Sequence, residues 1–179
     1  MSLVRRISWS DARVHNGIWD YRQSMPVYRA GVQTVGVVGV GRIGSAFAGK
    51  ARALGYRVIG YDANYSPDNN RFPQIEYVSF EKLLEESDVI SIHCSLNGET
   101  RHMFNEEAFD RMKPGAYLVN VARGAIVDGK ALNRALAERR IAGAGIDVVE
   151  EEALPAGHEL LQHENLIVTP HMAWYSEES

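Results

Sequence analysis

The stretch Thr34–Asp62, TVGVVGVGRIGSAFAGKARALGYRVIGYD, decides the fold of this chain. Residues 35–40 are mostly apolar and β-branched, which predicts a strand buried on both faces. Small and apolar side chains then recur at helical intervals as far as Leu54, and Gly55 ends that helix. Residues 57–61 predict the next strand. The stretch therefore predicts one unit of strand, glycine turn, helix and strand.

The glycines between the first strand and the helix have the spacing G-x-G-x-x-G. Gly39 allows a tight turn, Gly41 lets a pyrophosphate approach the backbone, and Gly44 lets the helix pack closely on the sheet. The helix N-terminus near Ile43 offers unpaired N–H groups to phosphates. Asp62, 18 residues after Gly44, can accept hydrogen bonds from a ribose and would repel a 2′-phosphate. These features predict a dinucleotide site that prefers NAD over NADP; a purely structural glycine turn is the alternative.

Length and composition restrict the class of protein. The chain has 179 residues, enough for one domain of ordinary size, and its net charge of −4 gives no broad basic surface for nucleic acid or membrane. No apolar run has the length of a membrane span. Cys94 is the only cysteine in the sequence, which excludes an intramolecular disulfide and fits a reducing, cytoplasmic compartment.

Strand and helix patterns alternate through the remainder of the chain. Further strands are expected at 75–78, 88–93, 116–120, 142–148 and 166–169, helices at 80–86, 105–112 and 128–140, and a helical turn at 157–162. This alternation predicts an α/β fold, a doubly wound parallel sheet with helices on both faces. Ligands bind such a sheet at the carboxyl ends of its strands, so the residues just after each strand are the candidates for function.

Residues 1–33 do not read as part of this sheet. Apolar residues such as Trp9 and Trp19 lie among charges without a clean period. Two interpretations remain open: a lead-in that lies on the surface, or an arm that uses these tryptophans as anchors in a dimer.

Three strand-end residues point to chemistry. Arg123 can bind a substrate carboxylate bidentately, although an arginine in a loop is usually only solvated. His171 follows the last strand, where a lone histidine is more often structural. Glu152 could hold an imidazole and raise its pKa, or belong to a solvated acidic loop. Beside a dinucleotide site, the three together favour hydride chemistry. His93 and Cys94 lack the spacing of a metal site, and no metal is expected.

Four segments in order resemble one known family. VGVVGVGRIG with Asp62, VNVARGAIVDGKAL, AGIDVVEEE and NLIVTPHMAWYSEES are similar to the NAD-binding (Rossmann) domain of the D-isomer-specific 2-hydroxyacid dehydrogenases. That family includes phosphoglycerate, glycerate and glyoxylate/hydroxypyruvate reductases and the C-terminal binding protein corepressors. The likeness runs from about residue 5 to the end of the chain. Two loops depart from the family pattern: Ser95 and Asn97 stand where many members have Pro-Leu-Thr, and Ala153 stands where proline is usual.

The resemblance implies roles for individual residues. Arg123 would bind the substrate carboxylate, His171 would be the acid/base at the 2-hydroxyl oxygen, and Glu152 would orient His171. Asp147 would lie near the nicotinamide carboxamide. The residues implied at the cofactor are Gly39, Gly41, Arg42, Ile43, Gly44, Asp62, His93, Cys94, Ser95, Asn97, Val121, Ala122, Asp147, His171 and Ala173.

The resemblance also implies a domain organisation and a function. Residues 34–175 would form the Rossmann domain, 1–33 a lead-in and dimer arm, and 176–179 the start of a truncated interdomain helix, with the substrate domain absent. The expected function is the NAD-binding catalytic half of a D-2-hydroxyacid dehydrogenase. Its partners would be NAD(H), a 2-hydroxy or 2-oxo acid and a second copy of the chain. With the substrate domain absent, the chain would bind NAD with low or no turnover. An NAD(H)-sensing interaction module like the corepressors is the alternative.

Overall fold

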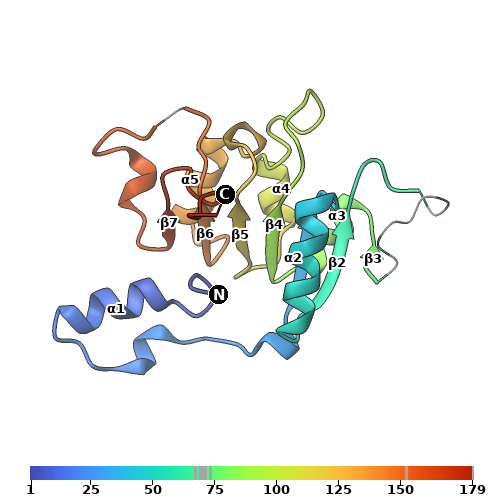
Figure 1. The fold of residues 1–179 in the computed structure, drawn as a ribbon. Helices are drawn as coiled ribbons and strands as arrows, with labels where there is room; N and C mark the ends of the chain where they lie inside the picture. The colour runs from blue at the N-terminus through green and yellow to red at the C-terminus, as the bar shows by residue number, and fades with distance from the viewer. Residues whose placement is uncertain (67, 69–71, 73, 152, 179) are drawn as a thin grey trace.

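The chain folds around one parallel sheet. A computed structural model describes residues 1–66, 68, 72, 74–151 and 153–178. Within this part, seven strands lie in the order β3-β2-β1-β4-β5-β6-β7, and every neighbouring pair is parallel (Figure 1). The strands are β1 (Thr34–Val38), β2 (Arg57–Tyr61), β3 (Glu76–Tyr77), β4 (Val89–Ile92), β5 (Tyr117–Asn120), β6 (Gly143–Ile146) and β7 (Leu166–Val168). The doubly wound parallel sheet predicted from the alternation is confirmed.

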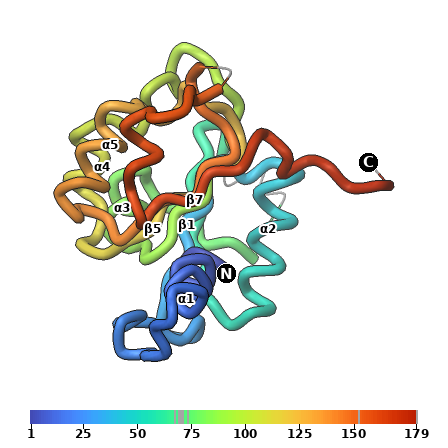
Figure 2. Tube along the Cα trace, turned by 90° about the vertical axis from the view of Figure 1, so that its left-hand side faces the viewer, coloured from blue at the N-terminus to red at the C-terminus, as the bar shows by residue number. Residues whose placement is uncertain are grey.

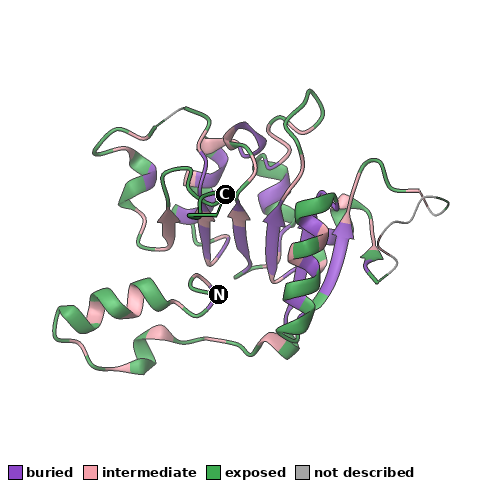
Figure 3. Cartoon of the chain, viewed as in Figure 1, coloured by how far each residue is buried: buried purple, intermediate pink, exposed green. Residues whose placement is uncertain are grey.

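Helices cover the two faces of the sheet unequally. One face carries α2 (Arg42–Ala53), and the other carries α3 (Phe80–Glu86), α4 (Glu106–Arg111) and α5 (Gly129–Ala137) (Figure 1). Alternating side chains of β1 serve both layers: Val35 and Val37 pack with α2, whereas Val38 packs on the opposite face. Figure 3 shows buried residues concentrated in the central strands. Strand β7, at the end of the sheet, is only partly buried.

Side-chain caps start the helices where the sequence predicts. Ser79 accepts a hydrogen bond from Lys82 N, and Asn105 accepts one from Ala108 N. Asp128 accepts from the first N–H groups of α5. Such caps satisfy backbone donors that have no partner within the helix. They fix the beginning of each helix, and with it the length of the loop that leaves the preceding strand.

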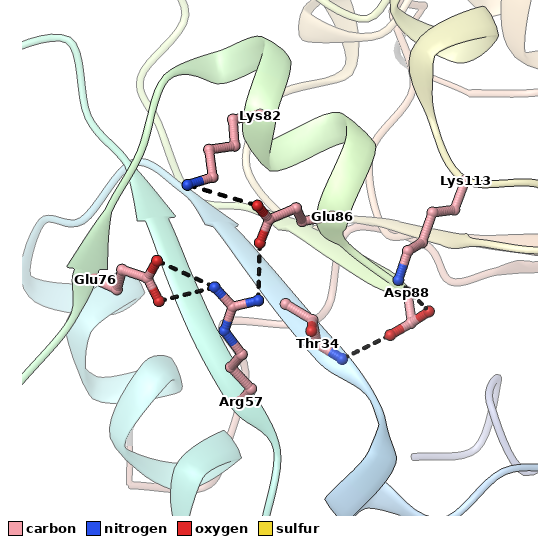
Figure 4. A network of polar contacts seen from close by, with 7 residues as sticks. All are labelled: Thr34, Arg57, Glu76, Lys82, Glu86, Asp88 and Lys113. Atoms are coloured by element: carbon pink, nitrogen blue, oxygen red, sulfur yellow. Dashed lines mark hydrogen bonds and ion pairs between the residues drawn. The ribbon is translucent and has the colours of Figure 1, made fainter.

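Ion pairs connect the strands at the amino edge of the sheet (Figure 4). Arg57, at the start of β2, donates to Glu76 at 2.9 Å and to Glu86 at 2.8 Å. Asp88, just before β4, accepts from the backbone N–H of Thr34 at 2.7 Å and from Lys113 Nζ at 3.0 Å. Asp88 ties the beginning of β4 to that of β1, and the register pairs Val38 at the end of β1 with Tyr61 and Ile92, so the carboxyl ends of β1, β2 and β4 lie level.

The N-terminal segment departs from the sheet. It forms α1 (Ile7–His15), a helix that the sequence analysis did not predict, and then the short turns η1 (Tyr21–Ser24) and η2 (Ala30–Val32). Figures 1 and 2 show α1 projecting away from the sheet. No residue of α1 is buried, which explains why its sequence lacks an apolar period. Among the described residues, no helix is long and apolar enough to cross a membrane.

Candidate cofactor and substrate site

The glycine turn after β1 is shaped by close packing. Gly39 has φ +89°, a left-handed conformation that favours glycine. A Cβ on Gly39 would lie 2.5 Å from the backbone nitrogen of Cys94, and one on Gly44 would overlap the carbonyl oxygen of Gly39. These two glycines therefore let the turn, the start of α2 and the loop after β4 pack against one another.

Gly41 differs from its two neighbours. Its φ of −82° is accessible to any residue, and a Cβ there would meet nothing within 4 Å. Neither backbone strain nor packing requires glycine at this N-cap position. The open space lies at the N-cap of α2, where no side chain caps the helix and the first N–H groups have no helical partner. The free N–H groups suit the negative charge of a pyrophosphate, and Arg42 and the 71% exposed Ile43 are the next residues of the helix beside this open cradle.

Asp62 is held beside this turn. Its Oδ2 accepts a hydrogen bond from Val40 N at 2.8 Å, and its Oδ1 accepts one from Asn64 N at 2.9 Å. Gly39 N also donates to the carbonyl of Tyr61 at 2.8 Å, which joins the ends of β1 and β2. Each carboxylate oxygen retains a lone pair for a ribose hydroxyl. The position predicted for the ribose-binding acid is therefore adjacent to the phosphate cradle.

His93 and Cys94 line the next strand end with neutral side chains. The His93 ring lies 5.0 Å from the ring of Phe47, and its Nε2 lies 2.9 Å from Ser91 Oγ. Burial lowers the pKa of His93 to about 4. Burial also raises the pKa of the Cys94 thiol to about 11. At neutral pH neither side chain is charged, so these two residues provide packing beneath the turn rather than a nucleophile or an acid/base.

The loop after Cys94 closes on itself. Asn97 Oδ1 accepts from the backbone N–H groups of Glu99 and Thr100, both at 2.9 Å, and Thr100 Oγ1 donates to the carbonyl of Ser95 at 2.8 Å. This is the loop that departs from the Pro-Leu-Thr pattern. Asn97 and Thr100 give it a defined turn by hydrogen bonding instead.

The ends of β5, β6 and β7 meet side by side. Asp147 N donates to the carbonyl of Asn120 at 2.9 Å, and His171 N donates to the carbonyl of Asp147 at 2.9 Å. Arg123 follows β5 with its side chain exposed, next to the 37% exposed Val121. His171 follows β7 and is exposed as well, with φ +53°. The sheet thus brings the loops of Arg123 and His171 to one edge, on either side of Asp147.

Asp147 shapes the turn that carries His171. Its Oδ1 accepts from Thr169 Oγ1 at 2.5 Å and from Met172 N at 2.9 Å, and its Oδ2 accepts from Ala173 N at 2.8 Å. Burial alone would raise the pKa of this carboxyl, but these hydrogen bonds outweigh burial and lower it. This contact joins residues more than 20 positions apart, so no local sequence pattern predicts it.

Glu152, the predicted partner of His171, lies outside the described residues, so its role stays a prediction. The neighbouring Glu150 is described: it pairs with Arg101, and with His102 Nε2 at 2.9 Å. The described residues contain no group of three or more metal-ligating side chains.

Comparisons with known proteins agree with this geometry. Residues 1–173 match the family described as D-isomer specific 2-hydroxyacid dehydrogenase, NAD binding domain. The chain belongs to this family. Its NAD-binding domain has the fold and the cofactor class that the sequence predicts.

Relatives and solved structures give the same result. A glyoxylate reductase of Korarchaeum cryptofilum is 44% identical over all of this chain and 55% of its own length. A chloroplastic D-3-phosphoglycerate dehydrogenase of Arabidopsis thaliana is 36% identical over 99% of this chain and 28% of its own. The D-lactate dehydrogenase of Aquifex aeolicus, solved with NAD and lactic acid, superimposes with a TM-score of 0.89, at 36% identity, over 99% of this chain and 57% of that one. The chain thus spans about half or less of these relatives.

Proposed function

We propose that this chain is the cofactor-binding half of an enzyme that transfers hydride between NAD(H) and a 2-hydroxy or 2-oxo acid. The observation that carries the proposal is an arrangement along the edge of the sheet where its strands end. The open glycine cradle and Asp62 lie after β1 and β2, and the exposed Arg123 and His171 lie after β5 and β7. NAD(H) would supply or accept the hydride. The residues of the chain would bind the cofactor and hold the acid.

The reaction assigns a separate task to each exposed side chain. In oxidation, bound NAD⁺ would accept the hydride from the 2-carbon, and the His171 imidazole would take the 2-hydroxyl proton. In reduction both steps reverse. The Arg123 guanidinium would bind the carboxylate with two parallel hydrogen bonds, which fixes the 2-carbon relative to the cofactor. Glu152 would orient His171, as the resemblance implies.

A chimaeric enzyme tests this function. Joining this chain to the substrate domain of the Korarchaeum relative should give NADH-dependent reduction of glyoxylate. His171→Ala should reduce kcat by at least about 100-fold at unchanged NADH affinity. Arg123→Lys should mainly raise KM, because an ammonium lacks the planar pair of donors. Full activity of both variants would overturn the assignment, and NADH binding without any turnover would favour the alternative of an NAD(H)-sensing interaction module.

We also propose that the N-terminal segment 1–33 binds a second copy of this chain. Trp19 is 89% and Tyr21 80% exposed, so the chain itself covers little of either aromatic side chain. A groove of about 920 Å³ lies between α1 and the amino edge of the sheet, with Leu3 and Tyr117 among its lining residues. Trp9 is already held by its own chain, since its Nε1 donates to Glu164, so Trp19 is the stronger anchor of the two predicted.

Sedimentation velocity tests the arm. The chain should sediment as a dimer at tens of micromolar, and Trp19→Ala with Tyr21→Ala should shift it to monomer. Leu54→Ala is the matched control, because Leu54 is also exposed but lies at the end of α2. A monomer at that concentration, or a dimer that the double variant does not weaken, would contradict the proposal.

A further inference from the structure

Asn120 is a buried polar residue at the end of β5. It is 1% exposed, in a position where strands of this sheet otherwise carry apolar side chains. Its Nδ2 donates to the carbonyl of Arg123 at 2.9 Å, and its Oδ1 accepts from Ala122 N at 3.1 Å. Both polar groups of this side chain are therefore used on the turn that carries Arg123.

The rest of the turn is also held by its backbone. The Arg123 carbonyl accepts a second hydrogen bond from Ile126 N at 3.3 Å, within η4 (Gly124–Ile126). A Cβ on Gly124 would overlap the backbone carbonyl of Val149, so this glycine lets the turn pack directly on the loop after β6. Arg123 itself has extended backbone, and its Nη1 donates to the carbonyl of Ala122 at 2.7 Å.

We propose that Asn120 is the positioning residue for Arg123. Its amide holds the backbone on both sides of the Ala122–Arg123 peptide, and so it fixes the direction in which the exposed guanidinium leaves the turn. Bidentate binding of a carboxylate depends on this direction, because two parallel hydrogen bonds require a defined plane. The inference rests on the proposed function, in which Arg123 is the carboxylate anchor.

The backbone order of the isolated chain tests the positioning directly. In ¹⁵N relaxation, Asn120→Ala should lower the order parameters of residues 121–124 from about 0.85 to below about 0.6. Asn120→Asp keeps the size and the acceptor for Ala122 but loses the donor to Arg123, so it should loosen Arg123 more than Ala122.

Asn165→Ala is the matched control for this experiment. The Asn165 amide also donates to a backbone carbonyl, that of Ala142 at 3.3 Å, but at the amino edge of the sheet. This variant should leave 121–124 ordered. Rigid 121–124 residues in both Asn120 variants, or equal loosening by Asn165→Ala, would overturn the proposal.

Ligand binding separates this inference from the proposed function. Oxamate, an unreactive 2-oxo carboxylate, is titrated into the NADH-saturated chimaera with the Korarchaeum substrate domain, which supplies the second surface of the substrate site. Asn120→Ala and Arg123→Ala should each raise the oxamate Kd of the NADH-saturated protein at least about tenfold, and Asn165→Ala should not. If Arg123→Ala has no effect on oxamate, the proposed role of Arg123 fails, while the order parameters still decide whether Asn120 holds the turn. An effect of Arg123→Ala without one of Asn120→Ala contradicts the inference alone.

Discussion

Two regions lie along the edge of the sheet that is formed by the carboxyl ends of its strands: a cofactor end around Gly39–Gly44 and Asp62, and a substrate end around Arg123 and His171. The two regions differ in how many of their contacts this chain provides. At the cofactor end, Gly39 and Gly44 pack against neighbouring backbone, and Asp62 has both carboxylate oxygens bonded to the chain. At the substrate end, Arg123 and His171 are exposed, and no hydrogen bond joins either side chain to another side chain of the described residues.

This difference suggests what each end needs. A dinucleotide meets mostly backbone and one carboxylate, so a single βαβ unit can preorganise its site. An acid substrate needs charged side chains held in a closed, water-poor space, which usually requires a second surface. Since the chain spans about half of its relatives or less, the substrate end is where the additional length of those relatives should matter.

The largest loss of stability and of NADH binding is expected when a side chain is added at Gly44, the most closely packed glycine of the cofactor end. Gly44→Ala places a methyl group against the carbonyl of Gly39, so the start of α2 must move away from the sheet. We expect a loss of about 3 kcal/mol in the free energy of unfolding and no measurable NADH binding. Urea unfolding measures the free energy of unfolding, and NADH fluorescence measures cofactor binding. Wild-type stability would mean that the turn is not packed as described.

Gly41→Ala should separate binding from folding. A methyl group at Gly41 meets no protein atom, so only the poorer N-cap preference of alanine should cost stability, about 1 kcal/mol, whereas the NADH Kd should rise at least about 30-fold because the cradle is filled. Gly49→Ala, in the same helix and also free of contacts, is the control and should bind NADH normally. Unchanged affinity in Gly41→Ala would remove the phosphates from this cradle.

Asp62→Ala should act on selectivity more than on folding. Losing the carboxylate removes an acceptor for the ribose and the repulsion of a 2′-phosphate, so NADH should weaken about tenfold while NADPH changes little or improves. Asp62→Asn keeps an acceptor and should weaken NADH less. Parallel titrations with NADH and NADPH give the ratio. An unchanged ratio in both variants would place the ribose elsewhere.

Asp147→Asn tests whether the ionised carboxylate of Asp147 stabilises the turn at the substrate end, through the pH dependence of stability. The native state lowers the pKa of Asp147, so its stabilisation is complete above the unfolded pKa of about 3.9 and is lost as the pH falls through the lower native value. The variant should be about 1–2 kcal/mol less stable than wild type near pH 7, and the difference should shrink progressively as the pH falls below the unfolded pKa of about 3.9. Urea unfolding across this range measures it. A difference that persists in acid would mean that ionisation of Asp147 does not stabilise the turn.

The smallest effects are expected from the exposed pair. Arg123→Ala and His171→Ala should change the stability of this chain by less than about 0.5 kcal/mol and its NADH affinity by less than about twofold. A large loss of either property would show that the two ends are coupled within this chain and would remove the distinction between them.

Sequence reasoning was most reliable where function depends on local backbone. The spacing of Gly39, Gly41 and Gly44 determines a turn within a few residues, and the two packed glycines have the contacts that this spacing predicts. Helix starts at Ser79, Asn105 and Asp128 were also predictable, because a cap and its N–H partners are neighbours in sequence.

Contacts between distant segments were not predictable in the same way. Asp147 meets Met172 and Ala173 only because β6 and β7 pair in the sheet. Asn120 gave a weak signal, a polar residue closing an otherwise apolar strand just before Arg123, that the sequence analysis did not use. The sequence of helix α1 carries no periodic apolar signal, because no residue of this helix is buried.

Titration of the isolated chain with NADH and with NADPH tests the central claim most directly. If the cofactor end is complete in this chain, NADH should bind at one site per chain and at least about tenfold more tightly than NADPH. Absence of NADH binding by the folded chain would contradict this account, because it would show that the glycine cradle and Asp62 do not form a cofactor site by themselves.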